Sequence, residues 1–458
     1  MGISISVKSS SQNNLSQITL VGLNSLGAIQ WSKSYGTNNC QYLHNTITKR
    51  TAIKHAGAIY YAGAVRDSAQ KQIGVLIKFD FIGNLIWQKF FRDSLLDVIP
   101  QVIAPSVDGG FLLTGFFQDW INPVSPCLLI KTDSNGNELW RKKLNKSVPN
   151  VSDGKAVIQD SVTKKIIVVG SQNYGNANSW VPFDNVFVTD SLGTILNHTW
   201  FTPGQIHDII RTKDKKYVVV GYNLINDFVP KYTSFVYKFD VNSPGVPIWR
   251  INNFGPQVDM NYFTSLKELP NEDILIAGNF DSSVTTDMRF NALSRFVRLN
   301  KNGQIMSVKD YDYSKDKTTD NIHLITCLNL TSDGGWITSV RCENAGNNPM
   351  FYVKYDSTGC DSSTYYCKTV GLDELSKQRI QVNIYPNPFT EAIHLDFDES
   401  ANVKHSVVLI YDVWGREVKR VMLEEKNSIL LSGLTKGMYL LKIKDGRRDL
   451  LNKTILKE

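Results

Sequence analysis

The chain lacks a long apolar segment, a block of like charges and an abundance of cysteine. Its 458 residues include 50 Lys and Arg against 43 Asp and Glu, for a net charge of +7, and only 6 Cys. No apolar run reaches the roughly 20 residues that a membrane-spanning helix needs. The mild, scattered positive charge is typical of a solvated surface and argues against a nucleic-acid partner. Aromatic residues at 11% and charged residues at 20% indicate a packed, ordered protein.

Signatures of catalysis are missing as well. The sequence has no Gly-x-Ser-x-Gly, no His-Glu-x-x-His, no phosphate-binding loop and no Gly-x-Gly-x-x-Gly. We therefore assign no catalytic residue, no metal ligand and no cofactor, and we expect the protein not to be an enzyme. A glycosidase-type pair of carboxylates stays open, because Asp and Glu recur at turns and nothing singles out two of them.

The six cysteines favour disulfides over a metal site. Cys327 and Cys342 lie on either side of the turn sequence at 332–335. A β-hairpin would place them opposite one another, within reach of a disulfide. Cys360 and Cys367 would close a second, short loop. Such bridges fit an oxidising compartment, whereas the paired short spacings of zinc sites are missing.

The most regular feature of the sequence is a repeated Lys-x-Asp-x-x-Gly-x-x-x-Trp element. Its clear copies contain Asp80, Gly83 and Trp87, then Asp133, Gly136 and Trp140, then, with a small expansion, Asp240, Gly245 and Trp249. Weaker copies centre on Gly27, Gly193, Gly303 and Gly359. By subtraction of their positions, the seven glycines lie 52 to 58 residues apart. A period in this range is typical of propellers, solenoids and arrays.

A second element falls between these glycines and consists of a turn followed by an apolar run that ends in glycine. Its clearest copy runs from Asp108 to Gly115, and a similar turn opens at Asp333. Together the two elements give each period about four short strands, as in one blade of a β-propeller. The Asp and Gly of the first element suit a tight turn, and its Trp offers apolar surface for packing between blades. We therefore predict an all-β fold with a β-propeller of six or seven four-stranded blades at 1–365. A β-solenoid, which usually has a shorter repeat, is the alternative.

The repeat also resembles motifs of known propellers. A Gly followed four residues later by Trp is similar to the tryptophan-docking motif of quinoprotein-type propellers, but the Asp-to-Gly distance and the period differ. The resemblance therefore implies no quinone cofactor. Residues 133–138 resemble a calcium loop because oxygen-bearing side chains alternate there. They lack a bidentate Glu downstream, so we expect a plain hairpin turn.

Three motifs follow one another near the C-terminus. They are Tyr385-Pro386-Asn387-Pro388, Asp412-x-x-Gly415-Arg416 and Gly437-x-Tyr439, before a last predicted strand that contains Lys453. Alternating apolar residues between the turns predict a small Ig-like β-sandwich at 381–458, after a linker at 366–380. This stretch resembles the type A C-terminal sorting domain of type IX secretion cargo in Bacteroidetes-type bacteria. The resemblance implies recognition by the type IX secretion machinery and removal by its sortase-like processing enzyme. The body would then be secreted or anchored at the outer cell surface.

Cargo of this system also needs a signal peptide, and Met1 to Val7 do not show one. We expect that the signal has been removed or that the N-terminus is incomplete. A repeat scaffold with an export address and no catalytic pattern favours a binding or adhesion module for an extracellular glycan or protein. An exported hydrolase acting on polysaccharide or peptide is the second hypothesis, and a structural surface-layer component is the third.

Overall fold

All regular structure in the described residues is β-strand. The computed structural model describes residues 2–458 except 10–15, 25–28, 37–40, 44–50, 68–70, 120–124, 145–150, 175–180, 201–203, 227–230, 253, 255–260, 282–290, 312–320, 344–349, 360–381, 398–405, 413–415, 424–427 and 446–447. The chain divides into two compact units, Met1–Val370 and Gly371–Glu458.

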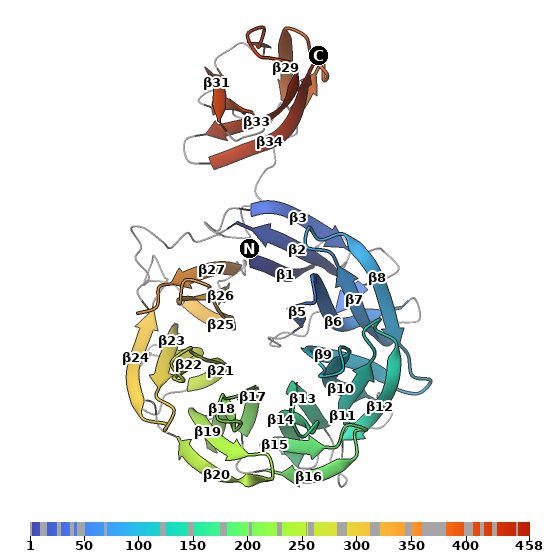
Figure 1. Ribbon diagram of the computed structural model, residues 1–458, viewed down its shortest axis with the longest axis vertical. Helices are drawn as coiled ribbons and strands as arrows, with labels where there is room; N and C mark the ends of the chain where they lie inside the picture. The colour runs from blue at the N-terminus through green and yellow to red at the C-terminus, as the bar shows by residue number, and fades with distance from the viewer. Residues whose placement is uncertain are drawn as a thin grey trace. The chain divides into compact units, whose positions relative to one another are not determined.

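The strands of the first unit form small sheets that follow one another around a ring (Figure 1). Blade 1 contains β1 (Gly2–Ser9), β2 (Ser16–Leu23) and β3 (Ile29–Tyr35). Blade 2 contains β4 (Gln41–Leu43), β5 (Ala52–His55), β6 (Ala58–Arg66), β7 (Gln72–Phe79) and β8 (Leu85–Phe91). Blade 3 contains β9 (Asp97–Pro105), β10 (Phe111–Gln118), β11 (Cys127–Thr132) and β12 (Glu138–Leu144). Blade 4 contains β13 (Val151–Gln159), β14 (Ile166–Tyr174), β15 (Val181–Thr189) and β16 (Ile195–Thr199).

Blades 5 and 6 repeat this order, with the first strand innermost and the fourth outermost (Figure 1). Blade 5 contains β17 (Gly204–Arg211), β18 (Tyr217–Asn226), β19 (Lys231–Asp240) and β20 (Ser243–Ile251). Blade 6 contains β21 (Asn261–Glu268), β22 (Ile274–Asp281), β23 (Asn291–Leu299) and β24 (Ile305–Tyr311). Blade 7 contains β25 (Asn321–Leu330), β26 (Trp336–Glu343) and β27 (Met350–Tyr355). A short parallel pairing of β23 with β25 joins blades 6 and 7 in one hydrogen-bonded sheet.

The first and last sheets are separate blades. Trp31 lies on β3, the position of the Trp-bearing fourth strand, so β1–β3 correspond to second, third and fourth strands. The turn that opens at Asp333 leads into β26, so β25–β27 correspond to first, second and third strands. Because these two sets overlap, they cannot complete one four-stranded blade. The described strands thus form seven blades, and the predicted propeller fold is confirmed.

The core of the ring lies between neighbouring blades. Each sheet is covered on both faces, so its central strands are continuously apolar. On β14 the four side chains from Ile166 to Val169 are each 0% exposed. One buried cluster joins Tyr60 and Leu76 of blade 2 to Phe111 and Leu128 of blade 3. In Figure 1 the first strands of the blades, such as β9, β13 and β17, lie nearest the middle of the ring.

The second unit is a sandwich of two antiparallel sheets. The smaller sheet contains β28 (Val382–Tyr385), β29 (Ala392–Phe397) and β32 (Ser428–Leu430). The larger contains β30 (Ser406–Tyr411), β31 (Glu417–Met422), β33 (Gly437–Asp445) and β34 (Arg448–Lys457). Ile393, Val408, Leu441 and Ile455 are each 0% exposed and belong to one core cluster. The predicted terminal β-sandwich is confirmed.

Candidate functional site

The repeat tryptophan of one blade packs against the turn glycine of the next. A Cβ atom added to Gly136 would lie 2.5 Å from the ring of Trp87. Gly136 also has a φ of +78°, which costs a residue with a side chain roughly 1–2 kcal/mol. The same contact recurs between Trp31 and Gly83, between Trp140 and Gly193, and between Trp249 and Gly303. Each of these Trp rings thus packs against the turn glycine of the following copy of the motif, and not against the glycine four residues before it.

The third clear copy of the motif departs from this arrangement. Asp240 pairs with Ser243 in a short hairpin, which leaves Gly245 inside β20. A Cβ on Gly245 would lie 3.0 Å from Oγ1 of Thr199 on β16, and not against a tryptophan ring. Gly245 therefore does not close the turn as the glycines of the other clear copies do.

The motif aspartate holds the turn. Asp133 Oδ1 accepts hydrogen bonds from the backbone N–H groups of Asn135 and Asn137 at 2.9 and 2.8 Å, and Oδ2 accepts one from Asn137 Nδ2 at 2.8 Å. Asp80 makes the matching three contacts in its own turn. Burial opposes ionisation of Asp133, but these hydrogen bonds outweigh it and lower its pKa. Both carboxylate oxygens of Asp133 therefore hold the turn.

The two sequence elements of the repeat are joined by an ion pair that sequence reasoning missed. Lys131, in the third strand of blade 3, is 3% exposed, and its Nζ lies 2.6 Å from Asp108 in the turn after the first strand. Blades 5, 6 and 7 repeat the pair as Lys238–Asp214, Arg298–Asp273 and Lys354–Asp333. The sequence signal for this ion pair was that both elements repeat with the same period. The strand register was needed to show that the Lys of one element lies beside the Asp of the other.

This pair predicts an asymmetric response to substitution. Asp108→Asn leaves the buried Lys131 ammonium without its counter-charge, which costs about 3 kcal/mol of unfolding free energy. Lys131→Met removes the buried charge and leaves Asp108, whose side chain is 55% exposed, to be solvated, so we expect a loss of about 1 kcal/mol or less. Urea unfolding of both variants measures the difference. Equal losses would contradict the assigned asymmetry.

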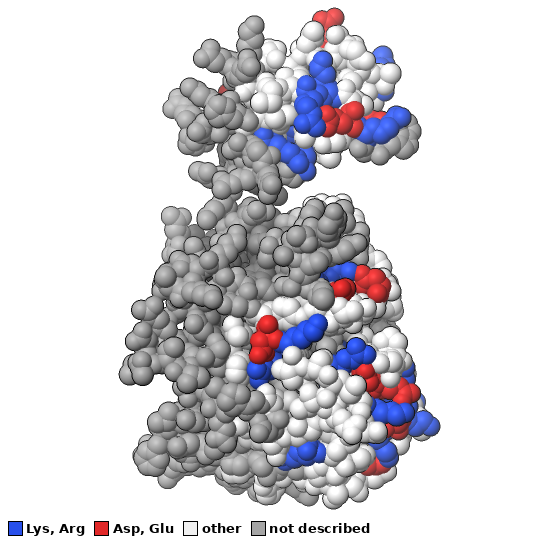
Figure 2. Space-filling view, turned by 90° about the vertical axis from the view of Figure 1, so that its left-hand side faces the viewer, with Lys and Arg blue, Asp and Glu red and all other residues white. Residues whose placement is uncertain are grey.

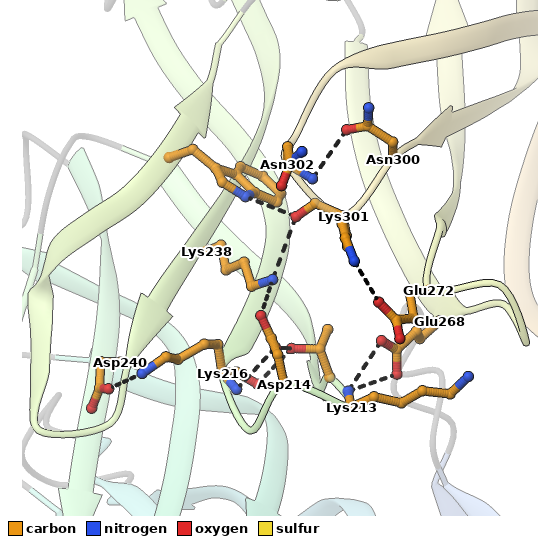
Figure 3. Close-up of polar contacts among 12 residues, drawn as sticks. Lys213, Asp214, Lys216, Lys238, Asp240, Glu268, Glu272, Asn300, Lys301 and Asn302 are labelled. Atoms are coloured by element: carbon orange, nitrogen blue, oxygen red, sulfur yellow. Dashed lines mark hydrogen bonds and ion pairs between the residues drawn. The ribbon is translucent and has the colours of Figure 1, made fainter.

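The turns of blades 5 and 6 meet in a polar network (Figure 3). The backbone N–H of Lys213 in blade 5 donates to both carboxylate oxygens of Glu268 in blade 6, at 3.1 and 3.0 Å. Lys301 Nζ pairs with Glu272 at 3.1 Å within blade 6. On the face drawn in Figure 2, basic and acidic side chains of the described residues likewise stand side by side. The network therefore joins blades 5 and 6, and the described residues on the face in Figure 2 carry charges of both signs.

Blades 4 and 5 are joined by a buried carboxylate. Asp160 is 3% exposed and lies 2.8 Å from Arg211 Nε, while its oxygens also accept hydrogen bonds from Tyr217 and from the backbone of Val162 and Thr163. Burial opposes its ionisation, but the hydrogen bonds, that of Tyr217 first, and the charge of Arg211 outweigh this and lower its pKa. Asp160 is thus an ionised link between two blades.

The lowered pKa of Asp160 predicts acid sensitivity. A carboxyl whose pKa is lower in the folded than in the unfolded state stabilises the fold above its unfolded pKa, near 4, and the effect is lost as pH falls through the folded pKa. Its size is on the order of 2 kcal/mol. We expect the melting temperatures of wild type and Asp160→Asn to differ by several degrees at pH 7 and to converge below pH 4. A gap that stays constant with pH would contradict this assignment.

The innermost strands share a β-bulge. In blades 3 to 7 the register against the second strand shifts at one point, so one residue is left unpaired in each, namely Gln101, Lys155, His207, Thr264 and Thr326. The glycines that end the apolar runs lie at this point. A Cβ on Gly170 or Gly221 would collide with the backbone carbonyl of Asp153 or Gln205. The glycine therefore allows the bulged strand to approach.

The predicted Cys327–Cys342 disulfide is wrong. Cys327 is a free thiol and lies opposite Ser339, whose Oγ is 3.0 Å from its Sγ. The pairing of Leu330 with Trp336 fixes the hairpin register, so Cys342 lies further along the strand than the facing position. The other predicted pair, Cys360 and Cys367, lies outside the described residues.

In the second unit, the segment from Tyr385 to Phe389 holds the end of the last strand. Asn387 Oδ1 accepts a hydrogen bond from Leu456 N at 2.8 Å, and its Nδ2 donates to Thr454 O at 3.2 Å. Phe389 is 1% exposed, and its N–H donates to Leu456 O at 2.9 Å. The peptide bonds before Pro386 and Pro388 are cis. The first motif thus covers the edge of β34.

The remaining motif residues also support the sandwich. Tyr439 is 6% exposed and donates its hydroxyl hydrogen to Thr435 O at 2.7 Å, two residues before Gly437, whose φ is +148°. Lys453 Nζ lies 3.4 Å from Val382 O on the other sheet. After β30, Asp412 Oδ2 pairs with Arg416 Nε at 2.7 Å. Gly415 lies outside the described residues.

A shallow hollow of about 550 Å³ lies on the larger sheet of this unit. Met438 and Leu440 on its floor are 58% and 44% exposed. Its charged lining residues are Asp412 and Lys442, and Asp412 is already paired with Arg416. The other lining residues are Tyr411, Tyr439 and Thr454, so the hollow is lined mainly by apolar and aromatic side chains. Across the described residues there is no group of three or more side chains placed to hold a metal ion.

The fold defines the class of the protein as a β-propeller followed by a β-sandwich, and the sandwich matches a known family. Residues 383–457 match the model of the secretion system C-terminal sorting domain. The chain therefore carries a C-terminal sorting domain and is cargo of the type IX secretion system, which implies export to the cell surface or the extracellular space. The described part of the chain contains no helix with the length and apolarity to cross a bilayer.

Solved structures resemble the chain in fold alone. An acylaminoacyl peptidase from Pyrococcus horikoshii matches with 10% identity and a TM-score of 0.33, over 79% of this chain and 59% of that one. A glycosyl hydrolase from Bacteroides ovatus matches with 11% identity and a TM-score of 0.35, over 72% of this chain and 88% of that one. No curated protein matches the chain.

Proposed function

We propose that the propeller is a binding module, displayed outside the cell, for an extracellular glycan or protein. The observation that carries this proposal is a difference between the two ends of the ring. Antiparallel strands place the turns between first and second and between third and fourth strands at one end. The other end holds the connections between second and third strands and between blades.

The turns at the first end are nearly constant in length, whereas the connections at the second end vary. By subtraction of strand bounds, third and fourth strands are joined by five residues in blades 1, 2, 3, 4 and 6. Second and third strands are joined by as few as four residues (227–230) and as many as nine (282–290). The turns of constant length contain the Asp that holds each turn and the Gly that packs against the Trp of the neighbouring blade, so they hold the blades together. Connections of varying length on a rigid scaffold are where proteins build binding surfaces.

The test uses purified full-length protein against immobilised polysaccharides and extracellular proteins of the host's surroundings. We expect saturable binding without release of products. Depolymerisation or peptide cleavage at enzyme-like rates would replace the binding proposal with the exported hydrolase. Self-assembly without any ligand would favour a surface-layer component.

The same proposal includes processing after export. A sortase-like enzyme removes the sorting domain, and the propeller is released or joined to the outer surface. The chain divides into compact units at Val370 and Gly371, so cleavage near that point leaves the propeller intact. Intact mass of the extracellular protein from its native host checks this. A species outside the cell that still ends at Glu458 would contradict removal.

A further inference from the structure

We propose that the outer face of the larger sheet of the sorting domain is the surface by which the export machinery holds the chain. The face is centred on Met438 and Leu440 of β33 and Leu456 of β34. Its partner is a protein surface of that machinery that presents apolar side chains with an acidic rim. The inference goes beyond the proposed function, because it concerns export and does not depend on what the propeller binds.

The side chains of the sorting motifs are engaged inside the sandwich. Asn387 binds the backbone of β34 through both ends of its amide. Tyr439 is buried and binds the carbonyl of Thr435, and Lys453 reaches the carbonyl of Val382 on the other sheet. These three motif residues hold the fold. A partner that requires the folded domain must therefore also contact residues outside the motifs.

The apolar residues of this face form one continuous patch. β33 and β34 lie side by side, with Met438 directly opposite Leu456 (Figure 1). Successive residues of a strand point to opposite faces of the sheet. Because Tyr439 and Ile455 point into the core, Met438, Leu440 and Leu456 stand on the outer face. Directly opposite residues have Cβ atoms about 4.5–5.5 Å apart, so the three side chains adjoin one another.

Such a face differs from an ordinary solvated sheet. The outer face of an antiparallel sheet is usually polar, yet here it holds a hollow of about 550 Å³ with Met438 and Leu440 on its floor. On the smaller sheet, the exposed Tyr385 stacks on the ring of His394, and Leu430 is exposed singly. Clustered exposed apolar side chains mark interaction sites, whereas single ones are normal. The flexible side chain of Met438 can also adapt its shape to a partner.

The edges of the larger sheet are less suited to docking than its face. Its strand order is β31, β30, β33 and β34, so β31 and β34 are the edge strands. The segment from Tyr385 to Phe389 occupies the end of β34. β31 carries the exposed charged residues Glu417, Lys419 and Arg420, a composition that discourages the addition of another strand. A partner therefore meets the sheet through its outer face.

The charges around the hollow select an acidic partner. Lys442 lines the hollow, and the carboxylate of Asp412 is paired with Arg416. In that pair the Asp412 side chain is 10% exposed and the Arg416 side chain 73%. A partner thus meets the guanidinium rather than the carboxylate. Two cations against one carboxylate leave a net positive charge beside the apolar patch, which complements an acidic rim.

The experiment follows export of the full chain in its native host. The double variant Met438→Gln/Leu440→Gln replaces two exposed apolar side chains by polar ones and leaves the core untouched. We expect its extracellular fraction, measured by quantitative immunoblot, to fall at least tenfold. The purified variant should keep the melting transition of the wild-type sorting domain, which separates loss of a docking surface from loss of the fold. Lys442→Glu should lower export several-fold by reversing the charge beside the hollow.

Two matched controls lie away from the hollow. Leu430 on β32 is 63% exposed, so Leu430→Gln makes the same change on the other sheet and should be exported like the wild type. Lys436→Glu is the control for charge, since Lys436 is exposed in the turn before β33. Normal export of the double variant, or an equal loss in Leu430→Gln, would overturn the docking surface. A wild-type dimer that the double variant dissociates would assign the face to a second copy instead. Equal export of Lys442→Glu and Lys436→Glu would overturn the acidic character of the partner.

Discussion

Ile455→Asp should abolish export of the chain while the propeller stays folded. Ile455 is 0% exposed, lies on β34 and faces the core of the sorting domain opposite Tyr439. An unpaired carboxylate buried there costs several kcal/mol, which approaches the whole stability of a small domain, about 5–15 kcal/mol. Detachment of β34 would also break the hydrogen bond from Leu456 N to Asn387 Oδ1 and that from Asn387 Nδ2 to Thr454 O. The expected result is a protein retained inside the cell, measured as its extracellular fraction by quantitative immunoblot.

The control for this variant is Ile455→Val, which removes one methylene at a cost of about 0.5–1.5 kcal/mol and should be exported normally. Thermal unfolding should show that Ile455→Asp loses the transition of the sorting domain and keeps that of the propeller. Normal export of Ile455→Asp with its sorting domain unfolded would mean that the machinery recognises a linear sequence. The folded sandwich would then not be the address.

The sorting motifs were visible in the sequence, but their physical roles were not. Tyr385 to Pro388 stand out because two prolines flank one Asn, and nothing local says what that Asn does. Its partner Leu456 is 69 residues away. Asn387 becomes interpretable only when the sandwich brings both ends of the domain together. The spacing of the motifs thus located the domain, and the position of β34 in the sandwich showed what Asn387 does.

The propeller fold could be predicted because the sequence repeats with a regular period. The contacts between blades could not be predicted, since they join residues of different copies of the repeat. Asp, Gly and Trp recur visibly, yet Trp87 contacts Gly136 of the next copy. Lys131 and Asp108 were noticed in separate elements and pair only across two strands. The cysteine error has the same origin: equal spacing around a turn suggested that Cys327 and Cys342 face one another, but the pairing of strands sets Cys327 opposite Ser339.

Gly136→Ala should destabilise the propeller far more than Gly109→Ala. Both glycines have positive φ, +78° and +87°, so both variants carry the left-handed penalty of roughly 1–2 kcal/mol. A Cβ at Gly109 meets nothing within 4 Å, whereas one at Gly136 lies 2.5 Å from Trp87. The Trp must then leave its place between blades 2 and 3, where overpacking of this kind costs about 1–3 kcal/mol more. Thermal and urea unfolding of the two variants measure the difference.

Trp87→Ala completes the argument, because it removes the ring that Gly136 accommodates. We expect Trp87→Ala alone to cost about 3 kcal/mol, the low end for a large core side chain, since Trp87 is half-buried. In the double variant with Gly136→Ala, the clash no longer exists. The double variant should therefore lose less unfolding free energy than the sum of the losses of the two single variants. Simple additivity would show that the two residues do not interact, and that positive φ alone explains the glycine. A shortfall close to the 1–3 kcal/mol assigned to the clash would locate the tryptophan's role in the seam between successive blades.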